Sequence, residues 1–223
     1  MIATLDERLW FPDPTLAGQF EDSLGGLIAV GGDLSIPRLL LAYRSGIFPW
    51  TEDPITWWSP NPRAILDFDR LHVGRGLRRV LCQDRFRITC NQDFPGVIDA
   101  CAAPYPGRDS TWITPGFQRA YTRLHHAGHA HSIECWQDQD LVGGIYGVAI
   151  GGFFAGESMF HRVDNTSKVA LVHLVAHLRK RGFVLFDLQM LTPLTQAMGA
   201  GVLPRADYLN RLRGAVGVAA SFL

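Results

Sequence analysis

A carboxylate and an amide lie two residues apart near the C-terminal end of the chain, in the apolar run FVLFDLQ at residues 183–189. The run has the length of a buried strand, so Asp187 and Gln189 are predicted to point to the same face, because side chains alternate along a strand. Burying both groups is costly unless they meet partners. They either form a structural network or orient an amine. Glu157 ends another strand-like run and is a candidate for the same cleft.

Large aromatic residues lie beside turn-forming residues, and four of the five named here stand within residues 1–63. Trp50, Trp57, Trp58, Trp112 and Tyr43 all stand next to proline, glycine or other turn residues. Any single tryptophan is more often a core residue, because tryptophan is highly buried on average. The functional alternative is base stacking, in which an indole covers the face of a nucleobase and contributes about 1–3 kcal/mol. Several such rings in one small region favour stacking.

A basic segment follows this aromatic region. Against the single acid Asp84 it carries six arginines, which are Arg70, Arg75, Arg78, Arg79, Arg85 and Arg87. Such a run is often an ordinary solvated face. The functional alternative is a local track for RNA phosphates, which would let a chain with a formal net charge of zero bind nucleic acid.

Several other kinds of chemistry are disfavoured. His125 and His129 have helical metal-ligand spacing, but Gly128 is expected to break the helix between them, so no metal site is predicted. The chain has no GxxxxGK[ST] phosphate loop and no Gly-x-Ser-x-Gly elbow. It also lacks the Arg/Gln-x-x-Gly-x-Gly/Ala turn that holds a CoA pyrophosphate in acetyltransferases. No cofactor is therefore expected.

The composition is that of a globular protein. Of 223 residues, 47% are hydrophobic and 19% charged, which suits a packed core. The four cysteines form no CxxC pair and are expected to be reduced thiols. Without a secretory leader or an apolar run of membrane-spanning length, the protein is expected to be soluble and cytoplasmic. No dimerisation stripe is readable, so a monomer is expected.

The pattern of elements that must position these side chains predicts an α+β fold. Residues 1–63, rich in proline, glycine and tryptophan, are expected to form a small α/β lobe with a helix after Ser35, and residues 64–223 a larger domain. The other expected helices cover residues 71–81, 115–126, 166–181 and 206–213. The expected strands cover 86–90, 130–136, 141–150, 152–160 and 183–189, of which the middle three form an antiparallel meander.

Taken together, these segments resemble the leucyl/phenylalanyl-tRNA–protein transferase family over about residues 10–210. The stretches that match, in order and with family-like spacing, are GGDLS (31–35), AYRSGIFPW (42–50), WWSPNPR (57–63), TWIT (111–114), HAHSIE (129–134), LVGGIYGV (141–148), GESMF (156–160), NTSKVAL (165–171) and FDLQ (186–189). Each stretch is weak alone, whereas the ordered set is specific.

The resemblance implies a small N-terminal lobe packed on a GNAT-like acyltransferase domain with a mostly antiparallel sheet. It implies that Trp50 and Trp112 flank the terminal adenosine of the tRNA, and that Asp187 and Gln189 are the catalytic pair. Glu157 corresponds to an acid near the acceptor. The implied substrate-binding residues around an apolar pocket are Tyr43, Tyr121, Phe154, Met159, Leu171, Ile145 and Phe186.

The implied reaction transfers Leu, Phe or Met from aminoacyl-tRNA to the N-terminal Arg or Lys of acceptor proteins and marks them for N-degron degradation. The arginines expected on the tRNA backbone are Arg75, Arg78, Arg79, Arg85 and Arg87. Whether Asp187 is a general base or only orients Gln189 stays open. Two alternatives remain, namely a CoA-dependent acyltransferase and a non-catalytic module that binds RNA or degrons.

Overall fold

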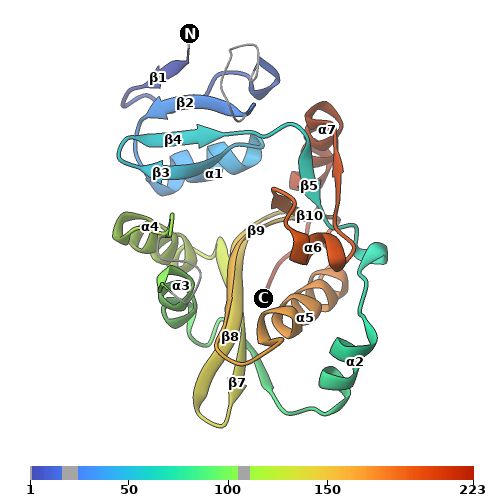
Figure 1. The fold of residues 1–223 in the computed structure, drawn as a ribbon. Coiled ribbons are helices and arrows are strands. Elements are labelled where there is room, and N and C mark those ends of the chain that lie inside the picture. Colours follow the sequence, from blue (N-terminus) through green and yellow to red (C-terminus); the bar gives the residue numbers. More distant parts are fainter. Residues whose placement is uncertain (1, 17–24, 105–110) are drawn as a thin grey trace.

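The computed structural model describes residues 2–16, 25–104 and 111–223, which fold into two β-sheets with helices around them (Figure 1). The predicted α+β class is confirmed, and most strand pairs in both sheets are antiparallel. Within these residues, no helix combines the length and the apolarity that crossing a membrane requires.

The first sheet has four strands in the order β1-β2-β4-β3. Its strands are β1 (Ala3–Leu5), β2 (Leu27–Gly31), β3 (Phe48–Glu52) and β4 (Ile55–Trp58). Helix α1 (Ile36–Arg44) follows Ser35 as predicted, with Pro37 in its first turn. It ends before Gly46, whose positive φ of 75° suits a residue without a Cβ. The chain then re-enters the sheet as β3, the strand that carries Trp50.

The second sheet has seven strands in the order β11-β5-β10-β9-β8-β7-β6. Its strands are β5 (Arg63–Ile65), β6 (Arg87–Cys90), β7 (Ala130–Gln137), β8 (Asp140–Ile150), β9 (Phe153–His161), β10 (Leu185–Gln189) and β11 (Gly201–Leu203). The predicted antiparallel meander β7-β8-β9 is confirmed. Strand β10 pairs parallel with β9 and antiparallel with β5, so it lies buried inside the sheet as its apolar sequence predicted.

Helices cover both faces of the meander (Figure 1). The remaining helices are α2 (Arg75–Cys82), α3 (Phe94–Ala102), α4 (Pro115–His126), α5 (Thr166–Lys180), α6 (Pro193–Ala197) and α7 (Arg205–Val216), with short 3-10 turns at Pro14–Leu16 and Phe68–Arg70. Helix α5 packs on one face, and α3 and α4 pack on the other. Each face therefore has its own hydrophobic core.

The expected helices at residues 115–126 and 166–181 are confirmed, because their apolar residues repeat at helical spacing and proline or Thr166 starts them. The helix expected from residue 71 begins only at Arg75, because Gly74 adopts the extended conformation of an N-cap. Helices α3 and α6 and strands β5 and β11 were not predicted.

Candidate active site

Glu157 owes its orientation to a β-bulge in β9. In the pairing of β8 with β9, Tyr146 is opposite Ser158 while Gly147 is opposite Gly156, so Glu157 is the extra residue. A bulge re-aims a side chain and is frequent beside active sites. Gly147 makes this close approach sterically feasible, because a Cβ at that position would lie 2.1 Å from the carbonyl oxygen of Ala155.

A second irregularity lies in the neighbouring strand β10. Its register against β5 shifts between Asp187 and Gln189, and Gln189 has a positive φ of 62°. The prediction that Asp187 and Gln189 share one face of a regular strand is therefore wrong, because the shift breaks the alternation between them. The parallel register of β9 and β10 ends at the pair Asp187–Ala155, which leaves Glu157 and Gln189 side by side.

Asp187 is fully buried and accepts four hydrogen bonds. Arg63 donates to both carboxylate oxygens, from Nε to Oδ1 over 2.9 Å and from Nη2 to Oδ2 over 2.6 Å. The backbone N–H of Gln189 donates to Oδ1 over 2.8 Å, and the Tyr208 hydroxyl donates to Oδ2 over 2.8 Å. A carboxylate has about four acceptor positions, and all of them are used here. Asp187 thus fixes the backbone of Gln189.

Arg63 also connects this carboxylate to the first sheet. Its Nη1 donates to the carbonyl of Gly46 over 3.2 Å, and its guanidinium lies 4.9 Å from the ring centre of Phe48 and 4.5 Å from that of Tyr208. Arg63 is only 1% exposed. One buried side chain therefore links the strand of Trp50 to the strand of Gln189.

Glu157 is the centre of a separate network. The Tyr43 hydroxyl donates to Oε1 over 2.8 Å, the Tyr121 hydroxyl to Oε2 over 3.1 Å, and Nε2 of Gln189 to Oε1 over 2.8 Å. The two tyrosine oxygens are themselves 2.5 Å apart. Burial raises the pKa of Glu157 to about 7, although the hydrogen bonds from both tyrosines act to lower it. Burial also raises the pKa of each tyrosine well above its usual range, so both remain protonated at neutral pH.

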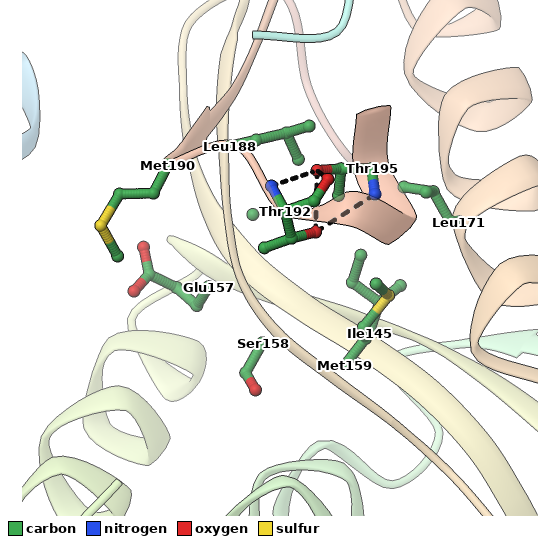
Figure 2. Close-up of a pocket in the computed structure, with 10 residues that line it drawn as sticks. Ile145, Glu157, Ser158, Met159, Leu171, Leu188, Met190, Thr192 and Thr195 are labelled. Atoms are coloured by element: carbon green, nitrogen blue, oxygen red, sulfur yellow. Dashed lines mark hydrogen bonds between the residues drawn. The ribbon is translucent and has the colours of Figure 1, made fainter. Parts of the chain in front are cut away.

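An inner cavity of about 210 Å³ opens between β9, β10, α5 and α6. It is lined by Ile145, Gly156, Glu157, Ser158, Met159, Leu171, Leu188, Met190, Thr192 and Thr195. Figure 2 shows the apolar side chains of Ile145, Met159 and Leu171 at one end and Glu157 with Met190 toward the other. The inner cavity is thus a mostly apolar pocket with a carboxylate at one end.

A second cavity of about 210 Å³, here called the tryptophan cavity, adjoins the inner one. It is lined by Phe48, Pro49, Trp50, Trp112, Glu157, Leu188, Gln189, Met190 and Thr192. Glu157, Leu188, Met190 and Thr192 line both cavities, so the two adjoin along these residues and are together called the cleft. The structure therefore brings Trp50, Trp112, Glu157 and Gln189 to the same site.

Both tryptophans of this cleft are half-buried and braced from the side. Trp50 packs edge-on against Trp58 with ring centres 5.1 Å apart, and Trp112 packs edge-on against Phe117 at 5.3 Å. Trp57, by contrast, is fully buried and donates to the carbonyl of Gly31. Of the two alternatives for a tryptophan, core residue or stacking surface, Trp57 is therefore a core residue. Because Trp50 and Trp112 also line the tryptophan cavity, part of each ring is open to it.

The strand of Trp50 is tied to the segment of Trp112. The Thr114 hydroxyl donates to Oε2 of Glu52, which lies two residues after Trp50. Both tryptophans also border an outer, more open hollow of about 620 Å³, which is lined by Trp50, Thr51, Glu52, Asp53, Thr111, Trp112 and Thr114. The cleft therefore continues past the tryptophans to the surface.

Some predicted site residues stand behind the cleft. Phe154 and Phe186 are buried and pack against each other with ring centres 5.8 Å apart, and neither lines the two cavities. Phe186 backs the wall at Gly156, where an added Cβ would lie 3.0 Å from its ring. Tyr43 and Tyr121 are also buried and reach the cleft through Glu157.

The predicted phosphate-binding arginines lie elsewhere. Those on or next to α2 are exposed, and α2 packs beside α5, at the end of the molecule away from the first sheet (Figure 1). Arg75, Arg78, Arg79, Arg85 and Arg87 line none of the cavities described above. These arginines therefore lie away from the cleft.

Several residues of the site had no signal in the sequence. Arg63 and Tyr208 contact Asp187 from 124 and 21 residues away, and neither stands in a recognisable spacing. Leu188, Met190 and Thr192 line the cleft because the strand is irregular there. The glycines of GGIYGV and AGES were a usable signal, since glycine inside a strand often marks a bulge.

Comparison with known proteins identifies the family of this chain. Residues 65–213 match the family model of leucyl/phenylalanyl-tRNA protein transferase, and residues 32–61 match the model of its N-terminal domain. A leucyl/phenylalanyl-tRNA–protein transferase of Ectopseudomonas mendocina is 53% identical over 210 residues, 92% of each chain. One of Pseudomonas aeruginosa strain LESB58 is 55% identical over 193 residues, 84% of this chain and 85% of that one.

Among solved structures, a GCN5-related N-acetyltransferase from Kribbella flavida is 12% identical, with a TM-score of 0.41 over 74% of this chain and 59% of that chain. The two family models together account for most of the sequence, and their ranges include every predicted site residue. This chain belongs to the leucyl/phenylalanyl-tRNA–protein transferase family.

Proposed function

We propose that this protein transfers leucine or phenylalanine from charged tRNA to the N-terminus of an acceptor protein, and that the reaction takes place in the cleft between the two tryptophans and the inner cavity. The family assignment supports the reaction class. The observation that carries the location is the position of Glu157, which lines both the apolar inner cavity and the tryptophan cavity.

The cleft suits the aminoacyl end of a tRNA. Trp50 and Trp112 stack on the terminal adenosine, and the aminoacyl side chain enters the inner cavity against Ile145, Met159 and Leu171. The ester then lies where the two cavities join. An apolar pocket separates side chains that differ by a methylene by only about 1–3 kcal/mol, so methionine is also a donor. β-Branched side chains fit poorly.

The acceptor enters with its amine toward Glu157 and Gln189. A carboxylate in this place attracts a cationic first residue, which suits an acceptor that begins with Arg or Lys. Addition of an apolar residue to such a protein creates an N-degron. The protein acts as a cytoplasmic monomer with a lobe at residues 1–63 and a catalytic domain at 64–223. The five arginines on and near α2 bind the tRNA backbone.

The donor ester is already activated, so the reaction needs no ATP. The acceptor amine has an ordinary pKa of about 7.7–8.0, which leaves a neutral fraction at pH 7. Holding amine and ester together accounts for up to about 7–11 kcal/mol of the barrier. Gln189 does this holding, since its backbone is fixed by Asp187 and its amide by Glu157. Asp187 is an orienting group, because its oxygens have no acceptor position left.

The test combines charged tRNA, a peptide that begins with Arg and the protein, and weighs the peptide by mass spectrometry. The expected result is a peptide heavier by one leucine or phenylalanine residue. An unchanged mass would favour a non-catalytic module that binds RNA or degrons. Calorimetric titration with acetyl-CoA tests the CoA-dependent alternative, and we expect no binding because the pyrophosphate loop is missing from the sequence.

A further inference from the structure

The two carboxylates near the reacting groups differ in access. Asp187 is fully buried, has all its acceptor positions filled and lines neither part of the cleft. Glu157 is only partly buried and is the one carboxylate among the described residues that line the inner and tryptophan cavities. A proton from a substrate in the cleft can therefore reach Glu157 and not Asp187.

Glu157 also has an acceptor position to spare. Its Oε1 accepts from Tyr43 and Gln189, whereas its Oε2 accepts from Tyr121 alone among the described residues. The bond to Oε2 is the longest of the three, at 3.1 Å. An incoming amine can thus hydrogen-bond to Oε2 without displacing a protein donor.

The contacts among Glu157, Tyr43 and Tyr121 accommodate one more proton than the two hydroxyls supply. The three groups make three mutual oxygen–oxygen contacts, of 2.5, 2.8 and 3.1 Å. Two hydroxyl protons can fill only two of them when Glu157 is ionised. A proton on Glu157 provides the third, so the arrangement accommodates the protonated carboxyl group.

The groups that face Glu157 keep the pKa of its carboxyl group close to neutral pH. Tyr43 of α1 and Tyr121 of α4 donate to it, while Gln189 of β10 donates from the other side. Burial and the negative charge of Asp187 raise the pKa of Glu157, and Arg63 acts to lower it. The resulting pKa of about 7 is well matched to proton transfer at neutral pH.

We propose that Glu157 is the general base of the reaction, a role that rests on the proposed function of the cleft. The neutral acceptor amine attacks the ester carbonyl carbon, and the new C–N bond forms as the nitrogen gives one proton to Oε2 of Glu157. The bond from the carbonyl carbon to the 3′ oxygen breaks, and Glu157 returns the proton to that oxygen. The carboxylate ends ionised, as it began, and no other reactant is consumed.

The test compares wild-type protein with Glu157→Gln and with Glu7→Gln, which makes the same chemical change at an exposed position. Transfer to an Arg-starting peptide is measured at saturating charged tRNA from about pH 6 to 8.5, with spontaneous ester hydrolysis subtracted. Loss of a general base predicts a fall of at least about 100-fold in the rate at saturating acceptor, in addition to any rise in KM from the lost attraction for the cationic acceptor. Glu7→Gln should match the wild type.

The pH profile gives a second readout. Below both pKa values, the wild-type rate constant at low acceptor concentration requires a neutral amine and an ionised Glu157, so its logarithm rises about two units per pH unit. In Glu157→Gln the slope should fall by about one. A variant whose saturated rate is unchanged while KM rises would overturn the proposal and make Glu157 an anchor for the cationic acceptor. If the wild type itself transfers nothing, the proposed function fails instead.

Tyr121→Phe provides a variant that keeps the carboxylate. Removing a hydroxyl that donates to the ionised form raises the pKa of Glu157, so the rising limb of the profile should move to higher pH. The rate at the high-pH plateau should stay within about tenfold of the wild type. A limb that stays in place would contradict the assignment, because the ionisation it reports would then belong to another group.

Discussion

At the scale of single residues, the carboxylates of Asp187 and Glu157 have different hydrogen-bond partners and different access to the cleft, which gives the two groups different roles. Arg63 neutralises Asp187, and four donors hold it in place. Glu157 meets three neutral donors and retains access to the cleft. The first carboxylate is therefore a fixed point that orients Gln189, while the second can change its charge during a reaction.

The proposed stacking role of Trp112 gives a prediction at this scale. Trp112→Ala removes one aromatic wall of the tryptophan cavity, and a lost base stack costs about 1–3 kcal/mol. We expect KM for charged tRNA to rise about 5- to 150-fold, since about 1.4 kcal/mol corresponds to a factor of ten. This KM is measured from initial rates over a range of charged tRNA concentrations.

Trp112→Phe is the matched control, because it keeps a ring that can stack and can still contact Phe117. Its KM should lie much closer to the wild-type value. Equal KM values for the alanine variant and the wild type would show that the nucleoside binds elsewhere.

Candidate residues could be found in the sequence where their type alone is unusual for its place. Trp50, Trp112 and Gln189 stood out because they interrupt turn-rich or apolar runs, and all three line the tryptophan cavity. Arg63 did not stand out, because its partner Asp187 is 124 residues away and only the folded chain brings them together. Long-range ion pairs have no local signature.

At the scale of elements, the site is made by two departures from regular strands. Glu157 is the extra residue of the bulge in β9, and Gln189 follows the register shift in β10. Both side chains line the tryptophan cavity. The pattern of apolar and polar residues predicted the strands themselves. The alternation of side chains between two faces assumes a regular strand, so the prediction wrongly placed Asp187 and Gln189 on the same face. Sequence patterns therefore find the long strands and helices more readily than the irregular positions that build the cleft.

The buried ion pair that links the elements gives a second prediction. Arg63→Met leaves Asp187 buried without its charge partner, and breaking such a pair costs about 3–5 kcal/mol. We expect the free energy of unfolding, measured by urea denaturation, to fall by that amount. Transfer activity should fall as well, because the position of Gln189 depends on Asp187.

Arg211→Met is the control for this variant. Arg211 and Asp67 form a 3.0 Å ion pair whose side chains are 52% and 42% exposed. Such exposed pairs contribute about 0–1 kcal/mol, so this variant should remain close to the wild type. Similar losses of unfolding free energy in the two variants would show that the buried ion pair contributes no more to stability than the exposed one.

At the scale of the whole molecule, the charge is balanced, so tRNA binding must depend on a local surface. The exposed arginines of α2 lie away from the cleft (Figure 1). Each phosphate contact contributes about 0.9 to the slope of log K against log salt concentration. Replacing Arg75, Arg78 and Arg79 with alanine should make that slope shallower by about 2–3 for charged tRNA, as measured by filter binding at several salt concentrations.

Transfer from a minimal aminoacyl-adenosine should be unaffected in this triple variant, because that donor lacks the tRNA body. The matched control replaces three other exposed arginines, Arg44, Arg119 and Arg213, with alanine. If both triple variants change the salt dependence equally, the contribution reflects overall charge and not a track along α2.

The walls of the inner cavity and the groups that handle the amine come from different parts of the fold. Ile145, Met159 and Leu171 belong to β8, β9 and α5, whereas Gln189, Tyr43 and Tyr121 belong to β10, α1 and α4. Glu157 lines the inner cavity with the first set and hydrogen-bonds to all three residues of the second. Substitutions of the apolar residues that line the inner cavity should therefore change donor preference and leave the proposed catalytic groups in place. Such variants would attach unnatural amino acids to the first residue of a protein.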